Sequence, residues 1–303
     1  MEETYPASSD FGENVRCITR DDPEYPGRLK ALPQMPDRLY VKGRLPADSK
    51  PTAAVVGARR CSAYGRIQAF HYAKYLSCQG VQVISGLATG IDAEGHKGAL
   101  EGESPTFAVL GNGADICYPV VNRPLYQRIL KEGGGIISEY PPGTRGQAWH
   151  FPARNRIISA LSDVVLVVEA REKSGSLITA GLALEQGKAV YAVPGAVNEP
   201  LSEGCHRLIY DGAGIAYHPE ILLTEWGIEA AKTKKSKTKN NLGLATDLNM
   251  VYSCLDLRPK NIEQIIEETG LSPAKTGCLL TELSLLGMAR ENGRQYYVRA
   301  DLL

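Results

Sequence analysis

The sequence predicts an α/β protein whose central sheet is mostly parallel and doubly wound. From Thr52 to about Gly227, short apolar segments alternate with helical stretches, a pattern typical of parallel strands covered on both faces. Several of these segments end in glycine-bearing turns, as expected where strands lead into helices. The chain has 303 residues, which allows about two domains. These observations predict an extended Rossmann-like domain with a small C-terminal domain after it.

Seven apolar segments are expected to form the strands of this sheet. In chain order they are residues 52–57, 81–86, 105–111, 135–138, 163–169, 188–193 and 214–217. The stretches between them have the helical character needed to connect parallel strands. Residues 1–46 are proline-rich and are expected to be an irregular N-terminal extension with a short extended piece at 39–41. The Rossmann-like domain is therefore placed at residues 47–230.

A basic linker is expected at residues 231–243. It contains the run KTKKSKTKNN, which has five lysines and no apolar residue, so it cannot bury enough surface to fold alone. Such a run is either a solvated tether or a basic arm close to nucleic acid, and a tether is the more common case.

Residues 244–303 are expected to form a winged-helix domain. Three helices are predicted at 251–257, 261–269 and 274–286, with a β-hairpin at 288–299 around Asn292–Gly293. In a winged helix that reads DNA, the third helix enters the major groove. Here that helix offers only Lys275, Thr276 and Thr281. The pattern fits DNA binding and protein docking equally well.

The composition indicates a cytoplasmic protein with no membrane association. Lysine plus arginine equals aspartate plus glutamate at 34 each, so a polyanion site must be a local patch. The seven cysteines are scattered without a C-x-x-C pair, which favours a reducing compartment. The N-terminus does not resemble a signal peptide, and no apolar run approaches the roughly 20 residues of a membrane span.

Turns at the predicted carboxyl ends of several strands have the residues of an anion site. Residues 173–176 (KSGS) follow the fifth strand and open a helix, so bare backbone N–H groups, two hydroxyls and a lysine are presented together. The run GARR at 57–60 follows the first strand and combines a glycine with two arginines, which bind phosphate in a bidentate way. Glycines also follow the second and third strands.

These turns are expected to converge on one site, because the carboxyl ends of parallel strands lie at one edge of the sheet. The run RNR at 154–156 lies near Tyr140, Trp149, His150 and Phe151. Arginines anchor a phosphate backbone and aromatic faces stack on unpaired bases, so single-stranded DNA is the favoured ligand, although a single aromatic residue more often lies in the core. The candidate DNA-binding residues are Gly57, Arg59, Arg60, Ser85, Gly86, Gly111, Arg154, Asn155, Arg156, Lys173, Ser174, Gly175 and Ser176.

No catalytic residue, metal site or cofactor is predicted. None of the turns matches G-x-G-x-x-G, and the Walker A pattern is absent, which disfavours dinucleotide and ATP chemistry. Asp92 and His96 lie four residues apart on one helix face, but a third metal ligand is missing. A hydrogen bond between them that braces the loop is therefore expected rather than acid–base work.

The ordered motifs resemble a known family, DNA-processing protein A (DprA, also called Smf). They are GARRCSAYG, ISGLATGIDAEGHKGAL, VLGNGADICYP, GGGIISEYPPG, HFPARNRIISALSDVVLVVEA, SGSLITAGLALEQGKAVYAVPG and GCHRLIYDGA. The resemblance runs from about Tyr25 to Gly214, and the tail is similar to the winged-helix domain of that family. It implies a homodimer that binds and protects incoming single-stranded DNA. It also implies displacement of single-strand-binding protein and loading of the RecA recombinase in natural transformation, without catalysis.

The motifs of that family transfer to this chain with some departures. The Gly-Ser-Arg motif corresponds to residues 57–59, Ser-Gly-x-Ala to 85–88, Arg-Asn-Arg to 154–156 and Ser-Gly-Ser to 174–176. Ala58 replaces the usual serine, Gly95 an alanine and His206 a common asparagine. Val120 and Val121 stand where some relatives have a basic residue, so the strength of DNA binding is expected to differ more than its location.

Two other interpretations use the same fold. A Rossmann-type nucleoside-monophosphate phosphoribohydrolase has the pattern P-G-G-x-G-T-x-x-E, whereas this chain has SGSLIT at 174–179 and lacks the glutamate at that spacing. A nucleotide-sensing or docking protein would work mainly through the winged helix. Fold alone does not decide among these functions.

Overall fold

The computed structural model describes residues 15–229, 246–255, 259–291 and 294–299. Contacts divide the chain into two units, residues 1–230 and 231–303. The predicted linker at 231–243 and the expected hairpin turn at Asn292–Gly293 lie outside the described residues.

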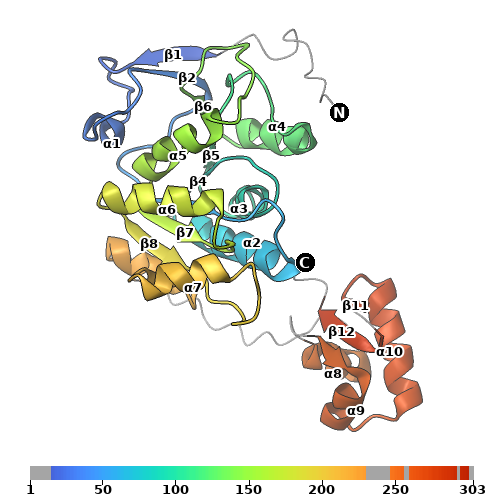
Figure 1. The fold of residues 1–303 in the computed structure, drawn as a ribbon. Helices are drawn as coiled ribbons and strands as arrows, with labels where there is room; N and C mark the ends of the chain where they lie inside the picture. Colours follow the sequence, from blue (N-terminus) through green and yellow to red (C-terminus); the bar gives the residue numbers. More distant parts are fainter. Residues whose placement is uncertain (1–14, 230–245, 256–258, 292–293, 300–303) are drawn as a thin grey trace. The chain divides into compact units, whose positions relative to one another are not determined.

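In its described part, the larger unit is built on one nine-stranded sheet (Figure 1). The strands are β1 (Arg16–Thr19), β2 (Arg38–Gly43), β3 (Thr52–Val56), β4 (Gln82–Ser85), β5 (Thr106–Leu110), β6 (Gly135–Ser138), β7 (Val164–Val167), β8 (Ala189–Ala192) and β9 (Gly214–Ile215). Their spatial order is β1-β2-β6-β5-β4-β3-β7-β8-β9. The seven strands from β6 to β9 are parallel, and β2 runs antiparallel to both β1 and β6.

All seven predicted strands are confirmed, each within two residues of its expected ends. The extended piece expected at 39–41 is confirmed as the middle of β2. The expectation of an otherwise irregular extension is wrong, because β1 and the whole of β2 join the sheet through the pairing of β2 with β6. In β2 only alternate residues such as Leu39 and Val41 are fully buried. A short strand with one exposed face has a weaker apolar signal than the continuous runs of the central strands.

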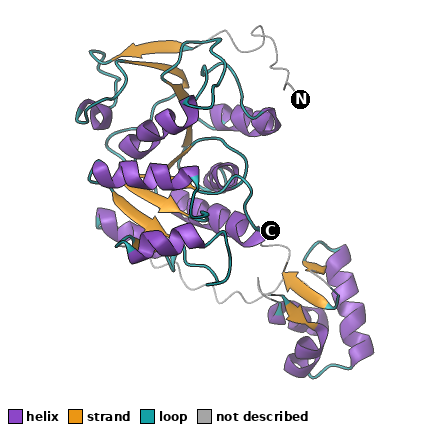
Figure 2. Cartoon of the chain, viewed as in Figure 1, coloured by secondary structure: helices purple, strands orange, loops and turns teal. Residues whose placement is uncertain are grey.

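Helices cover both faces of the sheet (Figure 2). One face packs against α1 (Gly27–Lys30), α5 (His150–Leu161), α6 (Gly175–Glu185) and α7 (Glu203–Tyr210). The other packs against α2 (Ala63–Cys78), α3 (Ile91–Ala99), α4 (Arg123–Lys131) and the 3-10 segment η3 (Pro219–Trp226), while a short 3-10 turn, η2 (Val120–Asn122), precedes α4. Successive residues of β3 point to opposite faces, with Ala54 and Val56 in one core and Ala53 and Val55 in the other. The fold is therefore the predicted doubly wound, Rossmann-like arrangement.

The order of the parallel strands reverses at β3. From β3 the chain proceeds outward through β4, β5 and β6, and it then returns to place β7, β8 and β9 on the opposite side. In open α/β sheets, ligands bind at the carboxyl ends of the strands that flank such a reversal. The crevice above β3 and β7 is therefore the expected position of a ligand site.

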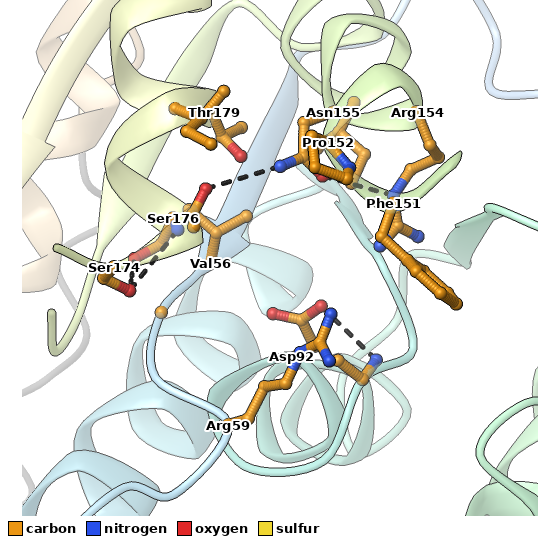
Figure 3. Close-up of a pocket in the computed structure, with 15 residues that line it drawn as sticks. Val56, Arg59, Asp92, Phe151, Pro152, Arg154, Asn155, Ser174, Ser176 and Thr179 are labelled. Atoms are coloured by element: carbon orange, nitrogen blue, oxygen red, sulfur yellow. Dashed lines mark hydrogen bonds between the residues drawn. The ribbon is translucent and has the colours of Figure 1, made fainter. Parts of the chain in front are cut away.

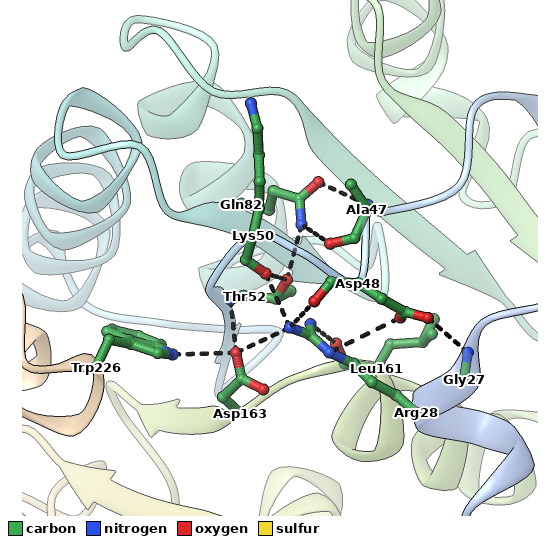
Figure 4. Close-up of polar contacts among 10 residues, drawn as sticks. All are labelled: Gly27, Arg28, Ala47, Asp48, Lys50, Thr52, Gln82, Leu161, Asp163 and Trp226. Atoms are coloured by element: carbon green, nitrogen blue, oxygen red, sulfur yellow. Dashed lines mark hydrogen bonds and ion pairs between the residues drawn. The ribbon is translucent and has the colours of Figure 1, made fainter.

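A polar cluster joins the beginning, middle and end of this unit (Figure 4). Asp163 Oδ2 accepts hydrogen bonds from the Thr52 N–H at 2.9 Å and from the Trp226 indole N–H at 3.0 Å, and it forms an ion pair with Arg28 at 3.2 Å. Arg28 also donates to the Leu161 carbonyl at 2.9 Å. One carboxylate thus receives donors from three distant segments of the chain.

The smaller unit contains three helices and a three-stranded antiparallel sheet within its described residues. They are α8 (Thr246–Cys254), α9 (Ile262–Thr269), α10 (Pro273–Leu285), β10 (Lys260–Asn261), β11 (Ala289–Glu291) and β12 (Tyr296–Arg299). The last two helices begin within one residue of their predicted positions, whereas α8 begins five residues earlier and β10 is not predicted at all.

The third helix of this unit, α10, has few side chains available for reading bases. Thr276 is fully buried, and Lys275 forms an ion pair with Asp247. Of the three side chains that the sequence offered for reading DNA, only Thr281 is neither buried nor in an ion pair among the described residues. Across the described part of the chain, no helix has the length and apolar character that crossing a membrane requires.

Candidate nucleic-acid interface

A pocket of about 340 Å³ lies at the reversal point of the sheet (Figure 3). It is formed by the loop after β3, the first turns of α5 and the start of α6. Seven of the thirteen candidate residues line it: Gly57, Arg59, Arg154, Asn155, Ser174, Gly175 and Ser176. The other six do not: Arg60, Ser85, Gly86, Gly111, Arg156 and Lys173.

The N-terminus of α6 contributes polar groups to this pocket. Ser174 is the N-cap residue, and its hydroxyl accepts a hydrogen bond from the Ser176 N–H and lies 2.8 Å from the Ser176 hydroxyl. The Gly175 N–H has no hydrogen-bond partner among the described residues. A free N–H and two hydroxyls at the positive end of an 11-residue helix favour an anionic ligand.

Gly175 differs from the other pocket glycine, Gly57, and from nearby Gly86. A methyl group at Gly57 would lie 2.7 Å from Ile91, and one at Gly86 would lie 2.6 Å from Arg154, so the protein's own packing requires both glycines. A methyl group at Gly175 would have no atom within 4 Å. The protein itself therefore gives no steric reason for glycine at this position, whereas the approach of a ligand would.

Arg59 supplies the accessible positive charge of the pocket. Its side chain is exposed, its guanidinium lies 5.5 Å from the centre of the Phe151 ring, and within the described chain it forms no ion pair. Arg60 and Lys173 are also exposed and unpaired among the described residues, and both adjoin residues of the pocket. These three cations can attract and hold a phosphate.

Arg154, by contrast, is a buried structural group. Only 4% of it is exposed, and its guanidinium donates to the carbonyl oxygens of Gly86, at 2.9 Å, and Val109. Burial lowers the pKa of Arg154 to about 10, which leaves it charged at neutral pH. Asp92 lies beside it and accepts a hydrogen bond from the Gly86 N–H at 3.1 Å, and burial raises the pKa of Asp92 while Arg154 opposes that change. This pair holds the loop after β4 in place.

Arg156 lies outside the pocket lining. Its guanidinium makes two hydrogen bonds to the Glu139 carboxylate, at 2.7 and 2.9 Å, and one to the Gln34 carbonyl at 3.0 Å. The residue between the arginines, Asn155, lines the pocket and donates to the Gly175 carbonyl at 3.4 Å. Of the RNR run, then, one arginine braces the sheet, the asparagine reaches α6 and the other arginine connects to the N-terminal segment.

The remaining candidates have structural partners. The Ser85 hydroxyl donates to the Val55 carbonyl at 2.6 Å, and the Gly111 carbonyl bonds to His150 Nδ1 at 2.9 Å. The expected bond between Asp92 and His96 is not formed. His96 Nδ1 instead lies 2.8 Å from the Thr106 hydroxyl oxygen. That hydroxyl donates its own proton to the Val83 carbonyl. His96 therefore donates from Nδ1, and burial lowers its pKa to about 3.

The sequence did not predict every residue that lines the pocket. Thr179 and Ile178 line it from α6, and Pro152 lines it from α5. Thr179 is four residues after Gly175, so helical periodicity alone would place the two on one face. Among the lining residues described, the one carboxylate is Asp92, which is already engaged with backbone N–H groups.

The fold and the pocket define a doubly wound α/β protein with a polar pocket at the reversal point of its sheet, lined by Arg59 and the start of α6. The sequence also matches the profile of the DNA recombination-mediator protein A family over residues 16–227. The chain belongs to this family.

Two proteins with similar sequences support this family assignment. The chain is 44% identical to protein Smf of Escherichia coli over 210 residues, which cover 69% of this chain and 56% of that protein. It is 39% identical to the DNA processing protein DprA of Bacillus subtilis over 214 residues, 70% of this chain and 72% of the relative. The chain thus matches little more than half of the length of the Escherichia coli protein.

Two solved structures share the fold. The crystal structure of DNA processing protein A from Streptococcus pneumoniae superposes with a TM-score of 0.67 at 38% identity, covering 73% of this chain and 77% of the other. DNA processing protein A from Helicobacter pylori, described for its single-stranded DNA binding mode, gives a TM-score of 0.62 at 29% identity and covers 70% and 95% of the two chains.

Proposed function

We propose that this protein is a non-enzymatic mediator of recombination that binds single-stranded DNA at the pocket between β3 and α6. The observation that carries this proposal is the combination of Arg59 with the open start of α6 at Gly175. Arg59 supplies an unpaired cation, and Gly175 supplies a free N–H and open space where a side chain would otherwise stand. The single-stranded DNA binding described for the Helicobacter pylori relative supports the same ligand.

A titration of single-stranded and duplex oligonucleotides at two salt concentrations tests this function. We expect the single strand to bind more tightly, with a logarithmic salt slope of about −0.7 for each phosphate contacted. Arg59→Ala should weaken binding to all sequences alike, because phosphate contacts carry no base information. Equal binding of single strand by the wild type and this variant would contradict the proposal.

We also propose the later steps that the family resemblance implies. As a homodimer, the protein would protect incoming DNA, displace single-strand-binding protein and load RecA during natural transformation. The measurement is the rate at which RecA begins DNA-dependent ATP hydrolysis on strands coated with single-strand-binding protein. We expect the wild type to shorten the delay. No change in the delay, with DNA binding intact, would restrict the function to DNA binding.

The hydrolase interpretation has a direct test. Purified protein is incubated with nucleoside monophosphates, and free base is measured. We expect no more free base than is released in buffer without protein, since Asp92 is buried and accepts hydrogen bonds from the backbone. Steady release of base that disappears in Asp92→Asn would replace the proposed function with an enzymatic one.

A further inference from the structure

Trp149 is the exposed member of the aromatic group at the start of α5. It is 62% exposed, whereas the adjacent His150 is 4% exposed. Phe151 lines the pocket and lies under Arg59, and Tyr140 is stacked on His150 at 3.9 Å between ring centres. A large apolar ring left mostly in water, beside partly covered ones, is characteristic of a recognition surface.

The exposed ring is held in one orientation. Its indole N–H donates to the Gln147 side-chain oxygen at 2.6 Å. The ring stands perpendicular to His150, with 4.0 Å between centres, and His150 is itself fixed by its bond to the Gly111 carbonyl. A ring positioned in advance loses little conformational freedom when a planar group stacks on it.

Trp149 also lies next to residues of the pocket in the sequence. It is the N-cap residue of α5, and the residues two and three positions later, Phe151 and Pro152, line the pocket. Two peptide units span at most about 7 Å, so the Cα atom of Trp149 lies within that distance of the Cα atom of Phe151, and a base attached to a phosphate in the pocket has the length to reach the indole.

We infer that Trp149 is a stacking platform for an unpaired base next to the phosphate site. This inference rests on the proposed function and deepens it, because it explains a preference for single strands. An unpaired base has a free face for the indole, whereas a base within a duplex is already stacked and paired. Every base has such a face, so the contribution is tolerant of sequence.

The test compares two oligonucleotides with equal numbers of phosphates, one of deoxythymidine and one of abasic sites. We expect the full-length wild type to bind the thymidine strand about 10- to 100-fold more tightly. Trp149→Ala should lose most of this difference while its affinity for the abasic strand stays unchanged. Trp149→Phe keeps a smaller ring and should retain part of it.

Tryptophan fluorescence gives a second, independent measurement. The chain has two tryptophans, and the other, Trp226, is tied to Asp163 in the polar cluster of Figure 4. Binding of the thymidine strand should quench the wild-type signal, and Trp149→Phe should abolish that quenching. The abasic strand should quench neither protein.

The outcomes separate this inference from the function on which it rests. If the wild type binds both strands equally and its fluorescence is unchanged, the stacking role is wrong, but DNA binding at the pocket stands. If the wild type binds neither strand, both the stacking role and the proposed function are wrong.

Discussion

Arg154 and Gly86, 68 residues apart in the sequence, are joined by a 2.9 Å hydrogen bond at the wall of the pocket. The same guanidinium bonds to the Val109 carbonyl, so one side chain of α5 fixes the ends of both β4 and β5. A guanidinium with this many internal acceptors has few donors left for DNA. Of the two arginines that line the pocket, Arg59 is therefore the one with an accessible charge.

Arg154→Ala should lower the free energy of unfolding by about 3–5 kcal/mol, because the buried Gly86 and Val109 carbonyls would lose their donor and Asp92 would lose the positive charge that opposes its desolvation. Arg154→Lys should lower the free energy of unfolding by less, because lysine keeps the positive charge. It should still be less stable than the wild type, because an ammonium group cannot bond to both carbonyls in a fork. Urea unfolding at pH 7 measures both. Wild-type stability in Arg154→Ala, together with lost DNA binding, would instead make Arg154 a phosphate ligand.

Gly175→Ala should weaken binding of single-stranded DNA at least tenfold, because the added methyl group would enter the open space at the start of α6 that a ligand in the pocket would occupy. The fold should tolerate the change, with a gain in stability of at most about 1 kcal/mol. Gly181→Ala is the matched control, because it lies in the same helix, also has no atom within 4 Å of the added methyl and does not line the pocket. Fluorescence anisotropy and thermal unfolding report the two effects, and equal affinities in the two variants would exclude a ligand at Gly175.

Arg59→Ala should reduce the salt slope of binding by about 0.7, the value for one lost phosphate contact on a single strand. Arg60→Ala removes the same charge from the adjacent position, which is exposed but outside the pocket lining. We expect a smaller change for it. Identical salt slopes in the two variants would indicate that Arg59 and Arg60 act only through the electrostatic field of the protein surface and that Arg59 makes no phosphate contact in the pocket.

The stability of the protein should decrease between about pH 6 and pH 4 because of His96. Its folded-state pKa is about 3, below the value of about 6.5 expected when unfolded. In this range His96 is protonated in the unfolded chain but not in the folded protein. The contribution of neutral His96 to the free energy of unfolding is therefore fully present above about pH 6.5 and falls by up to about 1.4 kcal/mol per pH unit below it. Urea unfolding at pH 7 and pH 5 should show a smaller decrease in His96→Gln. His218→Gln, at an exposed histidine, should behave like the wild type.

Asp163→Ala should destabilise the larger unit by about 3 kcal/mol, since three donors would lose one acceptor. Asp211→Ala removes an exposed partner of Arg207 and should change stability by less than about 1 kcal/mol. Thermal unfolding compares them, and equal losses would mean that the polar cluster adds no more than a surface ion pair.

The sequence predicted the parallel strands because each is apolar along its whole length. It failed at β1, a four-residue edge strand in which Ile18 alone is buried. The helix starts of α9 and α10 were predictable because Asn261 and Ser272 are good N-cap residues, and both side chains accept the expected N–H bonds.

The site was predictable in its location but not in the role of each side chain. Strand ends converge by topology, so the turns at 57–59 and 174–176 had to meet. Nothing local in the run RNR distinguishes a buried Arg154 from an Arg156 paired with Glu139. Those roles depend on carbonyls and carboxylates brought from remote parts of the chain.

Trp226 has a practical consequence for dividing this protein into pieces. Its indole completes the set of donors on Asp163, and the neighbouring Leu222 and Leu223 are fully buried against the sheet face that holds α2. A fragment that ends before η3 would lack these leucines, expose the apolar sheet face that they cover and leave the carboxylate one donor short. Separate expression of the larger unit therefore requires a chain that extends through Ile228, which also packs against this face.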